Sequence, residues 1–175
     1  MLSSKCKQIK KVIVFGGTSA AYFFISEAIK SNIEVIVFTT TFRLSGMIDK
    51  KRSLRDALSQ IKVKVIEDDE CPTKEILLPH IDEGTIGFSI VTFCIFKEEI
   101  LDLFQGRFYN YHGALLPEEK GGGTFTHKIL SQFYEGGVNI HKIDPGIDTG
   151  PIILEKRFEF PNICKKTIDF ENYKE

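Results

Sequence analysis

The sequence predicts an α/β fold in which helices flank a mostly parallel, twisted sheet. Short and continuous apolar runs recur along the 175 residues, and such runs are typical of strands that are buried on both faces of a parallel sheet. Segments with helical spacing of apolar residues separate these runs, and this alternation is the pattern of α/β proteins. The first run also ends in two glycines, as a turn from a strand into a helix often does.

The first three elements form a predicted strand–helix–strand unit. Residues 11–15, KVIVF, are the first strand, and Gly16 and Gly17 follow it. Residues 19–30 carry alanine and phenylalanine at helical spacing, and residues 34–38, EVIVF, repeat the apolar strand pattern. Two such strands joined by a helix are a βαβ unit, so these strands are expected to be parallel.

The middle of the chain predicts two more strands and two helices. A helix is expected near residues 54–60, and a short strand at residues 63–66 follows it. The next helix is predicted over residues 73–81, after Pro72, because proline suits the start of a helix. The apolar run SIVTFCIF, residues 89–96, predicts the fourth strand.

The last part of the chain contains more predicted strand than helix. The sequence indicates a short helix at residues 97–103, a strand at 107–112, a helix at 126–132, a strand at 137–142 and a strand at 152–160. No internal repeat or low-complexity linker interrupts the pattern. A single domain over residues 1–175 is therefore expected.

The composition limits the function classes. Hydrophobic residues make up 42% and charged residues 27%, and the net charge is −1, which indicates a globular protein without the basic footprint of a nucleic-acid binder. No run approaches the roughly 18 apolar residues of a membrane span. The cysteines Cys6, Cys71, Cys94 and Cys164 are scattered and form no CxxC motif. We therefore expect neither a zinc ribbon nor a disulfide scaffold, and we expect a reducing cytoplasm as the location.

An amide and an imidazole share one face of the strand in FYNYHGALLPEEKGGGTFTH, which starts at Phe108. Asn110 and His112 are two residues apart, so both side chains point the same way. A buried strand rarely carries two polar side chains on one face without partners. Both groups can donate hydrogen bonds to an oxygen that develops negative charge, which indicates an oxyanion site. A satisfied core histidine or a solvated edge strand is the alternative.

A second polar segment, HKIDPGIDTG, begins at His141. Asp144 and Asp148 flank a Pro-Gly pair, and Asp-Pro-Gly alone is typical of a plain turn. The functional alternative is that one aspartate reaches the same site, orients His112 and helps to carry protons. The histidines His112, His127 and His141 lack the short helical spacing of metal ligands, so no metal is expected.

The glycine turn after the first strand is a third candidate. Gly16, Gly17, Thr18 and Ser19 could hold a phosphate through backbone amides and the helix dipole. A tight turn with Ser19 as the N-cap is the alternative. Because ligands bind beyond the carboxyl ends of parallel strands, this turn, residues 94–96 and the Asn110–His112 pair are expected to face one crevice.

The segments NYHGALLPEEKGGG and GGVNIHKIDPGIDTGPII together resemble the formyltransferases that depend on N10-formyltetrahydrofolate. That family carries Asn-x-His, then Leu-Leu-Pro, and a downstream aspartate before Thr-Gly or x-Gly. Asn110, His112 and Asp148 fall on its three catalytic positions. The resemblance covers residues 93–161 well and residues 12–38 weakly. It implies a Rossmann-like formyltransferase catalytic core, with N10-formyltetrahydrofolate as co-substrate and no metal.

The resemblance also implies roles for other positions. The residues that would bind the folate are Phe93, Cys94, Ile95, Phe96, Leu116, Asp144 and Gly146, and those that would bind the acceptor are Gly16, Gly17, Thr18, Ser19, Gly121 and Gly122. In the implied reaction the acceptor amine attacks the formyl carbon. Asn110 and His112 then meet the oxyanion, and Asp148 manages the proton.

Departures from the family pattern bear on the acceptor. Glu118-Glu119-Lys120 replaces a typical Lys/Arg-Tyr/Trp-Arg segment, Glu98-Glu99 replaces a common proline, and Gly-Gly-Thr-Ser-Ala replaces the Gly-x-Gly-Ser-Asn loop of the glycinamide ribonucleotide enzymes. The near-neutral charge and the chain end at Glu175 argue against the methionyl-tRNA enzymes. By elimination, the resemblance favours the sugar N-formyltransferases.

The favoured acceptor is therefore a nucleotide-linked amino sugar, such as dTDP-4-amino-4,6-dideoxyglucose, for surface polysaccharide or O-antigen biosynthesis. The alternatives are a phosphoribosylglycinamide formyltransferase, a methionyl-tRNA formyltransferase and an inactive folate-binding relative. The expected partners are small-molecule substrates and a second copy in a homodimer, with no nucleic acid and no membrane. Sugar enzymes of the family normally continue past this point, so a core without its C-terminal extension is expected.

Overall fold

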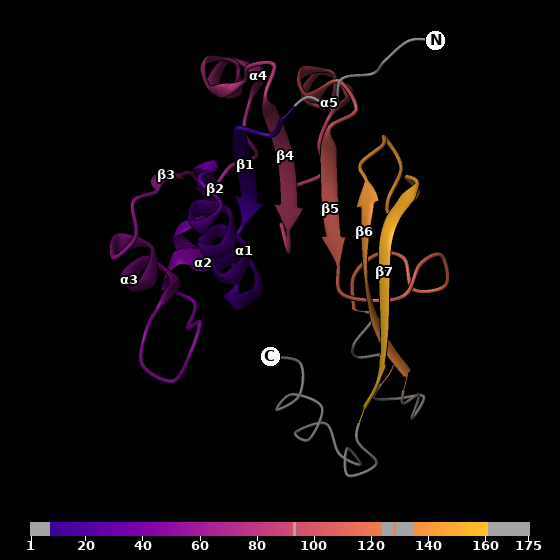
Figure 1. Ribbon diagram of the computed structural model, residues 1–175. Coiled ribbons are helices and arrows are strands. Elements are labelled where there is room, and N and C mark those ends of the chain that lie inside the picture. Colours follow the sequence, from indigo (N-terminus) through magenta and orange to yellow (C-terminus); the bar gives the residue numbers. More distant parts are fainter. Residues whose placement is uncertain (1–7, 93, 124–127, 129–134, 161–175) are drawn as a thin grey trace. The chain divides into compact units, whose positions relative to one another are not determined.

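The computed structural model describes residues 8–92, 94–123, 128 and 135–160. The chain divides into two compact units, Met1–Phe108 and Tyr109–Glu175. The predicted α/β class is confirmed, with strands flanked by helices (Figure 1). Among the described residues, no helix is both long enough and apolar enough to cross a membrane.

Four parallel strands form the sheet of the first unit. They are β1 (Lys11–Gly16), β2 (Glu34–Thr39), β3 (Lys64–Glu67) and β4 (Thr85–Ile90), in the spatial order β3-β2-β1-β4 (Figure 1). The apolar side chains of β1 and β2 are buried. This agrees with the prediction from their continuous apolar runs.

The helices of the first unit are short, apart from the first. They are α1 (Ser19–Lys30), α2 (Thr41–Ser45), α3 (Leu54–Ser59), α4 (Lys74–Leu77), the 3₁₀ helix η1 (Leu78–His80) and α5 (Glu98–Phe104). The N-cap of α1 is Thr18, not Ser19, because the Thr18 hydroxyl accepts the hydrogen bond from the Ala21 amide. The helix α2 was not predicted from the sequence.

An aromatic cluster fills the core of the first unit. The ring centroids of Phe96 and Phe104 lie 4.6 and 4.5 Å from that of Phe108, and the ring of Phe96 lies 5.1 Å from that of Phe15. A Cβ at Gly87 would come within 2.6 Å of the Phe108 ring. Glycine at this position of β4 therefore lets the ring pack directly on the backbone of the strand.

The fourth strand lies earlier in the chain than predicted. Residues 89–96 were expected, whereas β4 is Thr85–Ile90 and pairs along its whole length with β1. Val91 has a positive φ of 53°, which ends the extended conformation directly after Ile90. The apolar residues after Val91 do not continue the strand. Phe96 packs in the core, whereas Ile95 is 74% exposed.

A disulfide joins two loops at the carboxyl ends of β3 and β4. Cys71 and Cys94 are linked, with their Cα atoms 5.5 Å apart and a sequence separation of 23. The scattered spacing of the cysteines did not indicate this bridge. The loops after β3 and β4 can meet because both leave the carboxyl edge of the same parallel sheet, although β2 and β1 separate the two strands. No sequence spacing expresses this.

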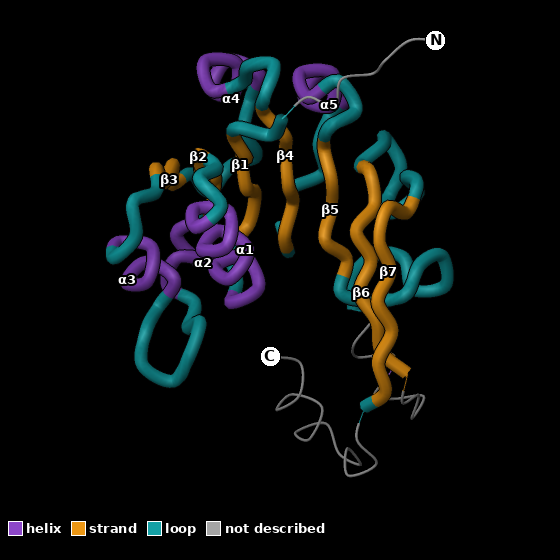
Figure 2. The backbone as a smooth tube through the Cα atoms, viewed as in Figure 1, coloured by secondary structure: helices purple, strands orange, loops and turns teal. Residues whose placement is uncertain are grey.

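The second unit contains three antiparallel strands. The first of these, β5, begins at the last residue of the first unit. They are β5 (Phe108–His112), β6 (Glu135–Lys142) and β7 (Ile152–Glu159), with β6 between the other two (Figure 2). The strands predicted at residues 107–112, 137–142 and 152–160 are thus confirmed. The helix predicted at residues 126–132 falls almost entirely outside the described residues.

Candidate active site

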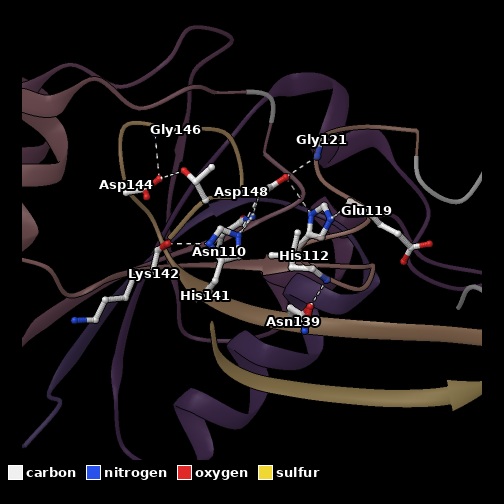
Figure 3. Close-up of polar contacts among 12 residues, drawn as sticks. Asn110, His112, Glu119, Gly121, Asn139, His141, Lys142, Asp144, Gly146 and Asp148 are labelled. Atoms are coloured by element: carbon white, nitrogen blue, oxygen red, sulfur yellow. Dashed lines mark hydrogen bonds and ion pairs between the residues drawn. The ribbon is translucent and has the colours of Figure 1, made fainter. Parts of the chain in front are cut away.

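Four polar side chains lie together on one face of β5 and β6. Asn110 is directly opposite His141, and His112 is directly opposite Asn139. Because opposite residues of an antiparallel pair share a face, the register alone gathers two amides and two imidazoles. Asn139 is 0% exposed and His141 is 2% exposed, so the face is buried and its polar groups need partners (Figure 3).

Asp148 connects these side chains. It lies between β6 and β7 with a positive φ of 50°, and its Oδ2 accepts the backbone hydrogen of Gly121 at 2.9 Å. Its Oδ1 accepts from Asn110 Nδ2 at 3.3 Å, and its Oδ2 lies 3.5 Å from His112 Nδ1. The structure therefore brings the three predicted catalytic residues together around one carboxylate (Figure 3).

The ring of His112 is held from both sides. Its Nε2 lies 2.6 Å from the Glu119 carbonyl oxygen, and a carbonyl can only accept, so Nε2 carries a hydrogen. Its Nδ1 faces the Asp148 carboxylate. Both ring nitrogens thus face oxygen atoms of the protein, which fixes the orientation of the ring.

Two members of this polar face were not predicted as site residues. His141 Nδ1 donates to the Lys142 carbonyl at 2.8 Å, and its Nε2 lies 3.1 Å from Asn110 Nδ2 and 3.2 Å from Asp148 Oδ1. Asn139 Oδ1 accepts from the Leu116 amide at 2.7 Å. The signal was present in the sequence, because Asn139-Ile140-His141 repeats the Asn-x-His spacing of the first motif.

From the sequence, His141 is a candidate only for a metal site, together with His112 and His127. In the structure both of its nitrogens have protein partners, and His127 lies outside the described residues. Within the described ranges, no group of three or more histidine, cysteine, aspartate or glutamate residues is placed to hold a metal ion.

The predicted folate residues Asp144 and Gly146 build the turn that carries Asp148. Asp144 Oδ1 accepts from the Gly146 amide at 3.1 Å and from the Thr149 hydroxyl at 2.6 Å. A Cβ at Gly150 would lie 1.9 Å from the Lys142 carbonyl, so glycine is needed there for the close approach of the chain. In this structure, therefore, Asp144 closes the turn, whereas Asp148 reaches the polar face.

The segment after β5 combines a buried wall with an open loop. Leu115 and Leu116 are buried, and the bond between Leu116 and Pro117 is cis. Gly121 has a positive φ of 79°, and a Cβ at Gly121 or Gly122 would meet no atom of the described residues within 4 Å. This loop therefore leaves space beside Asp148, which is what the predicted acceptor role of the two glycines requires.

The remaining predicted site residues belong to the first unit. Gly16 and Cys94 line one pocket there, together with Phe15, Phe38, Thr39, Thr40, Arg43, Asp68, Glu70, Pro72 and Thr92. Gly17 packs so closely that a Cβ would lie 2.9 Å from the Thr39 hydroxyl, a buried group without a hydrogen-bond partner in the described part of the chain. Ser19 is the first residue of α1, and Phe93 lies outside the described residues.

Several known proteins resemble this chain in sequence or in structure. A methionyl-tRNA formyltransferase from Wolbachia pipientis subsp. Culex pipiens is 28% identical over 159 residues, which are 85% of this chain and 51% of the relative. The solved N-formyltransferase from Helicobacter canadensis, in complex with folinic acid and dTDP-3-aminofucose, is 28% identical with a TM-score of 0.69, covering 88% of this chain and 54% of that one.

A phosphoribosylglycinamide formyltransferase from Bacillus halodurans matches with a TM-score of 0.71 at 22% identity, over 94% of this chain and 87% of that one. At that identity the likeness concerns the fold alone. The chain spans about half or less of the length of the curated methionyl-tRNA formyltransferases that it matches. The family model described as formyl transferase matches residues 10–168, so the chain belongs to the formyl transferase family.

Proposed function

We propose that this protein transfers a formyl group from N10-formyltetrahydrofolate to the amine of a nucleotide-linked amino sugar. The observation that carries the transfer is the contact of Asn110 and His112 with the two oxygens of Asp148. In a member of the formyl transferase family, these groups match the needs of an acyl transfer to an amine: hydrogen-bond donors for a developing oxyanion and a carboxylate for the released proton.

The chemistry follows from where the hydrogens point. The folate supplies the formyl group, and a new C–N bond forms when the acceptor nitrogen attacks the formyl carbon. The bond between that carbon and folate N10 then breaks, and N10 takes up a proton as tetrahydrofolate leaves. Asn110 Nδ2 and His112 Nδ1 both point toward the Asp148 carboxylate, so they can converge on a formyl oxygen that binds beside it. Asp148 takes the proton that the amine loses, and its charge supports the His112 ring.

The proposal also specifies the acceptor and the biosynthetic process that the reaction serves. The Helicobacter canadensis enzyme that was solved with dTDP-3-aminofucose shares 28% identity with this chain. The space that the described residues leave beside Gly121 and Gly122 supports an acceptor site at this loop. We place the reaction in surface polysaccharide synthesis in the cytoplasm, with small-molecule substrates only and the protein as a homodimer.

Methionyl-tRNA is the second candidate acceptor, because methionyl-tRNA formyltransferases are among the curated relatives that match this chain. A folate-binding protein without activity is the third. An assay of folate release separates the three when it is run with dTDP- and UDP-linked 3- and 4-amino sugars, glycinamide ribonucleotide and methionyl-tRNA. Turnover is expected with at least one amino sugar and with neither other acceptor. Turnover of methionyl-tRNA or glycinamide ribonucleotide alone would overturn the sugar assignment, and none with any amine would leave folate binding only.

Asp148→Asn is the control in this assay. The variant keeps the size of the side chain and removes the charge that holds His112 and accepts the proton, so folate release should fall to the background rate. Equal rates for the variant and the wild type would show that the release does not come from this site.

A further inference from the structure

Glu119 makes contacts through its backbone and its side chain that all bear on His112. Its carbonyl holds His112 Nε2 at 2.6 Å, and its own amide donates to the Leu115 carbonyl at 2.8 Å. Its carboxylate oxygen Oε2 accepts from the Leu115 amide at 2.7 Å. Both polar backbone atoms of Leu115 are therefore bound to Glu119, which closes residues 115–119 into one turn.

The other carboxylate oxygen of Glu119 anchors this turn to the start of β6. Oε1 lies 2.7 Å from Lys128 Nζ, and the Lys128 side chain is only 4% exposed. The same ammonium donates to the Glu135 carbonyl at 2.6 Å. A buried ammonium is costly unless it is paired, so the Glu119–Lys128 pair strongly favours a single position of the turn.

Glu119 is one of two adjacent glutamates in the segment Glu118-Glu119-Lys120. The neighbouring Glu118 is exposed. Of the two adjacent glutamates, only Glu119 has its carboxylate in the network that leads to His112.

We propose that Glu119 is a positioning residue for formyl transfer, which fixes through its ion pair with Lys128 the carbonyl that holds His112 Nε2. The ring is thereby set so that Nδ1, and not Nε2, faces Asp148 and the reacting oxygen. The inference rests on the proposed function for its catalytic consequence. The orientation of the ring is a separate claim that can be measured without turnover.

The first test replaces each glutamate in turn. Glu119→Gln keeps an oxygen for the Leu115 amide but removes the charge that pairs with Lys128. A misplaced catalytic group costs about 10²-fold in rate, so kcat should fall by about that factor while KM for the folate changes little. Glu118→Gln should match the wild type. The proposal would be overturned if the wild type is active and both glutamine variants have the same kcat as the wild type.

A double variant separates positioning from mere loss of stability. Glu119→Gln leaves the Lys128 ammonium buried without its carboxylate, which lowers the melting temperature by itself. Adding Lys128→Met removes that buried charge and should restore the melting temperature, whereas kcat should stay low because the anchor is still missing. Recovery of kcat together with the melting temperature would show a purely structural role and overturn the proposal.

Nitrogen-15 NMR of the histidine rings tests the orientation directly. In the wild type His112 should show a protected hydrogen on Nε2, and Glu119→Gln should remove this protection while Glu118→Gln leaves it unchanged. If His112 is pinned in this way and no amine is formylated, the proposed function fails and the orientation stands. If the wild type is active and its Nε2 hydrogen is unprotected, the positioning proposal fails and the function stands.

Discussion

Asp148 gathers four polar groups from different parts of the second unit. The amide of Asn110, the rings of His112 and His141, and the backbone N–H of Gly121 all meet its two oxygens. Removing Asp148 therefore affects the orientation of several groups at once. Asn110 and His112 act on the same developing charge, so the effects of single changes at these residues should not add.

Substitution of the three residues should reduce turnover without unfolding the protein. Asn110→Ala and His112→Ala each remove a hydrogen-bond donor to the oxyanion, which typically costs about 10²–10³ in turnover. Asp148→Asn should cost as much or more, because the charge that supports His112 is lost. The check is kcat and melting temperature on the same preparations. Folded variants that all keep turnover within a few-fold of the wild type would refute the catalytic assignment.

Asp82 links the pH dependence of stability to one exposed ion pair. The hydrogen bond from Lys11 Nζ at 2.8 Å is the main cause that lowers the pKa of Asp82 to about 2, and the Thr85 hydroxyl and Gly84 amide contribute. Because the pKa is lower in the folded state than the ordinary value of 3.8, this contribution to stability is present above that value and disappears as the pH falls toward about 2.

The variant Asp82→Asn should therefore show a shallower pH dependence of the free energy of unfolding between about pH 4 and pH 2. Urea unfolding at several pH values measures this slope. An unchanged slope in the variant would mean that the Lys11–Asp82 pair does not form in solution.

Strands β5 and β6 show how far a pattern within one element predicts the site. The spacing of Asn110 and His112 was enough to predict a shared polar face, and the structure adds Asn139 and His141 on the facing strand. Their pairing depends on the register between two segments that lie 31 residues apart at Asn110 and His141. Periodicity within one strand does not encode that register, so His141 was missed although its motif was visible.

The loop after β4 offers a test of the predicted folate contacts. The Ile95 side chain is 74% exposed, so its predicted contribution is the backbone. Ile95→Pro removes one N–H donor and restricts φ, and it should abolish folate binding. Ile95→Ala, which keeps the amide, should bind normally. Titration calorimetry measures both affinities, and unchanged binding by the proline variant would place the folate elsewhere.

The Cys71–Cys94 bridge ties the same loop to the loop after β3. It spans 23 residues in sequence, and in the chain-entropy model a crosslink of this length stabilises the folded state by about 3 kcal/mol. Reduction of the wild type should lower its free energy of unfolding by about that amount. Cys71→Ser should be as stable as the reduced wild type and should not respond to reductant. Equal stability of the oxidised and reduced wild type would argue against the bridge.

At the scale of the whole chain, the sequence predicted the class of fold correctly. It did not predict the bounds of β4 or the disulfide between Cys71 and Cys94. The alternation of apolar runs and helices identified the parallel strands of the first unit. The shift of β4 was not predictable from hydrophobicity, because SIVTFCIF is apolar throughout and only the φ of Val91 ends the strand. The disulfide was also missed, since it depends on which loops meet at the carboxyl edge of the sheet. A cytoplasmic location stays a prediction, and the bridge bears on it because disulfides are rare there.

The outer strand β7 has a consequence for how this protein behaves at high concentration. All of its residues are exposed. Apolar surface lies on both sides of the charged residues 155–157, at Ile152, Ile153, Leu154 and Phe158. An exposed edge of this composition is a template for self-association, and charged side chains are the usual protection against it. Aggregation, followed by light scattering, should therefore begin along this strand and should worsen when salt screens those charges.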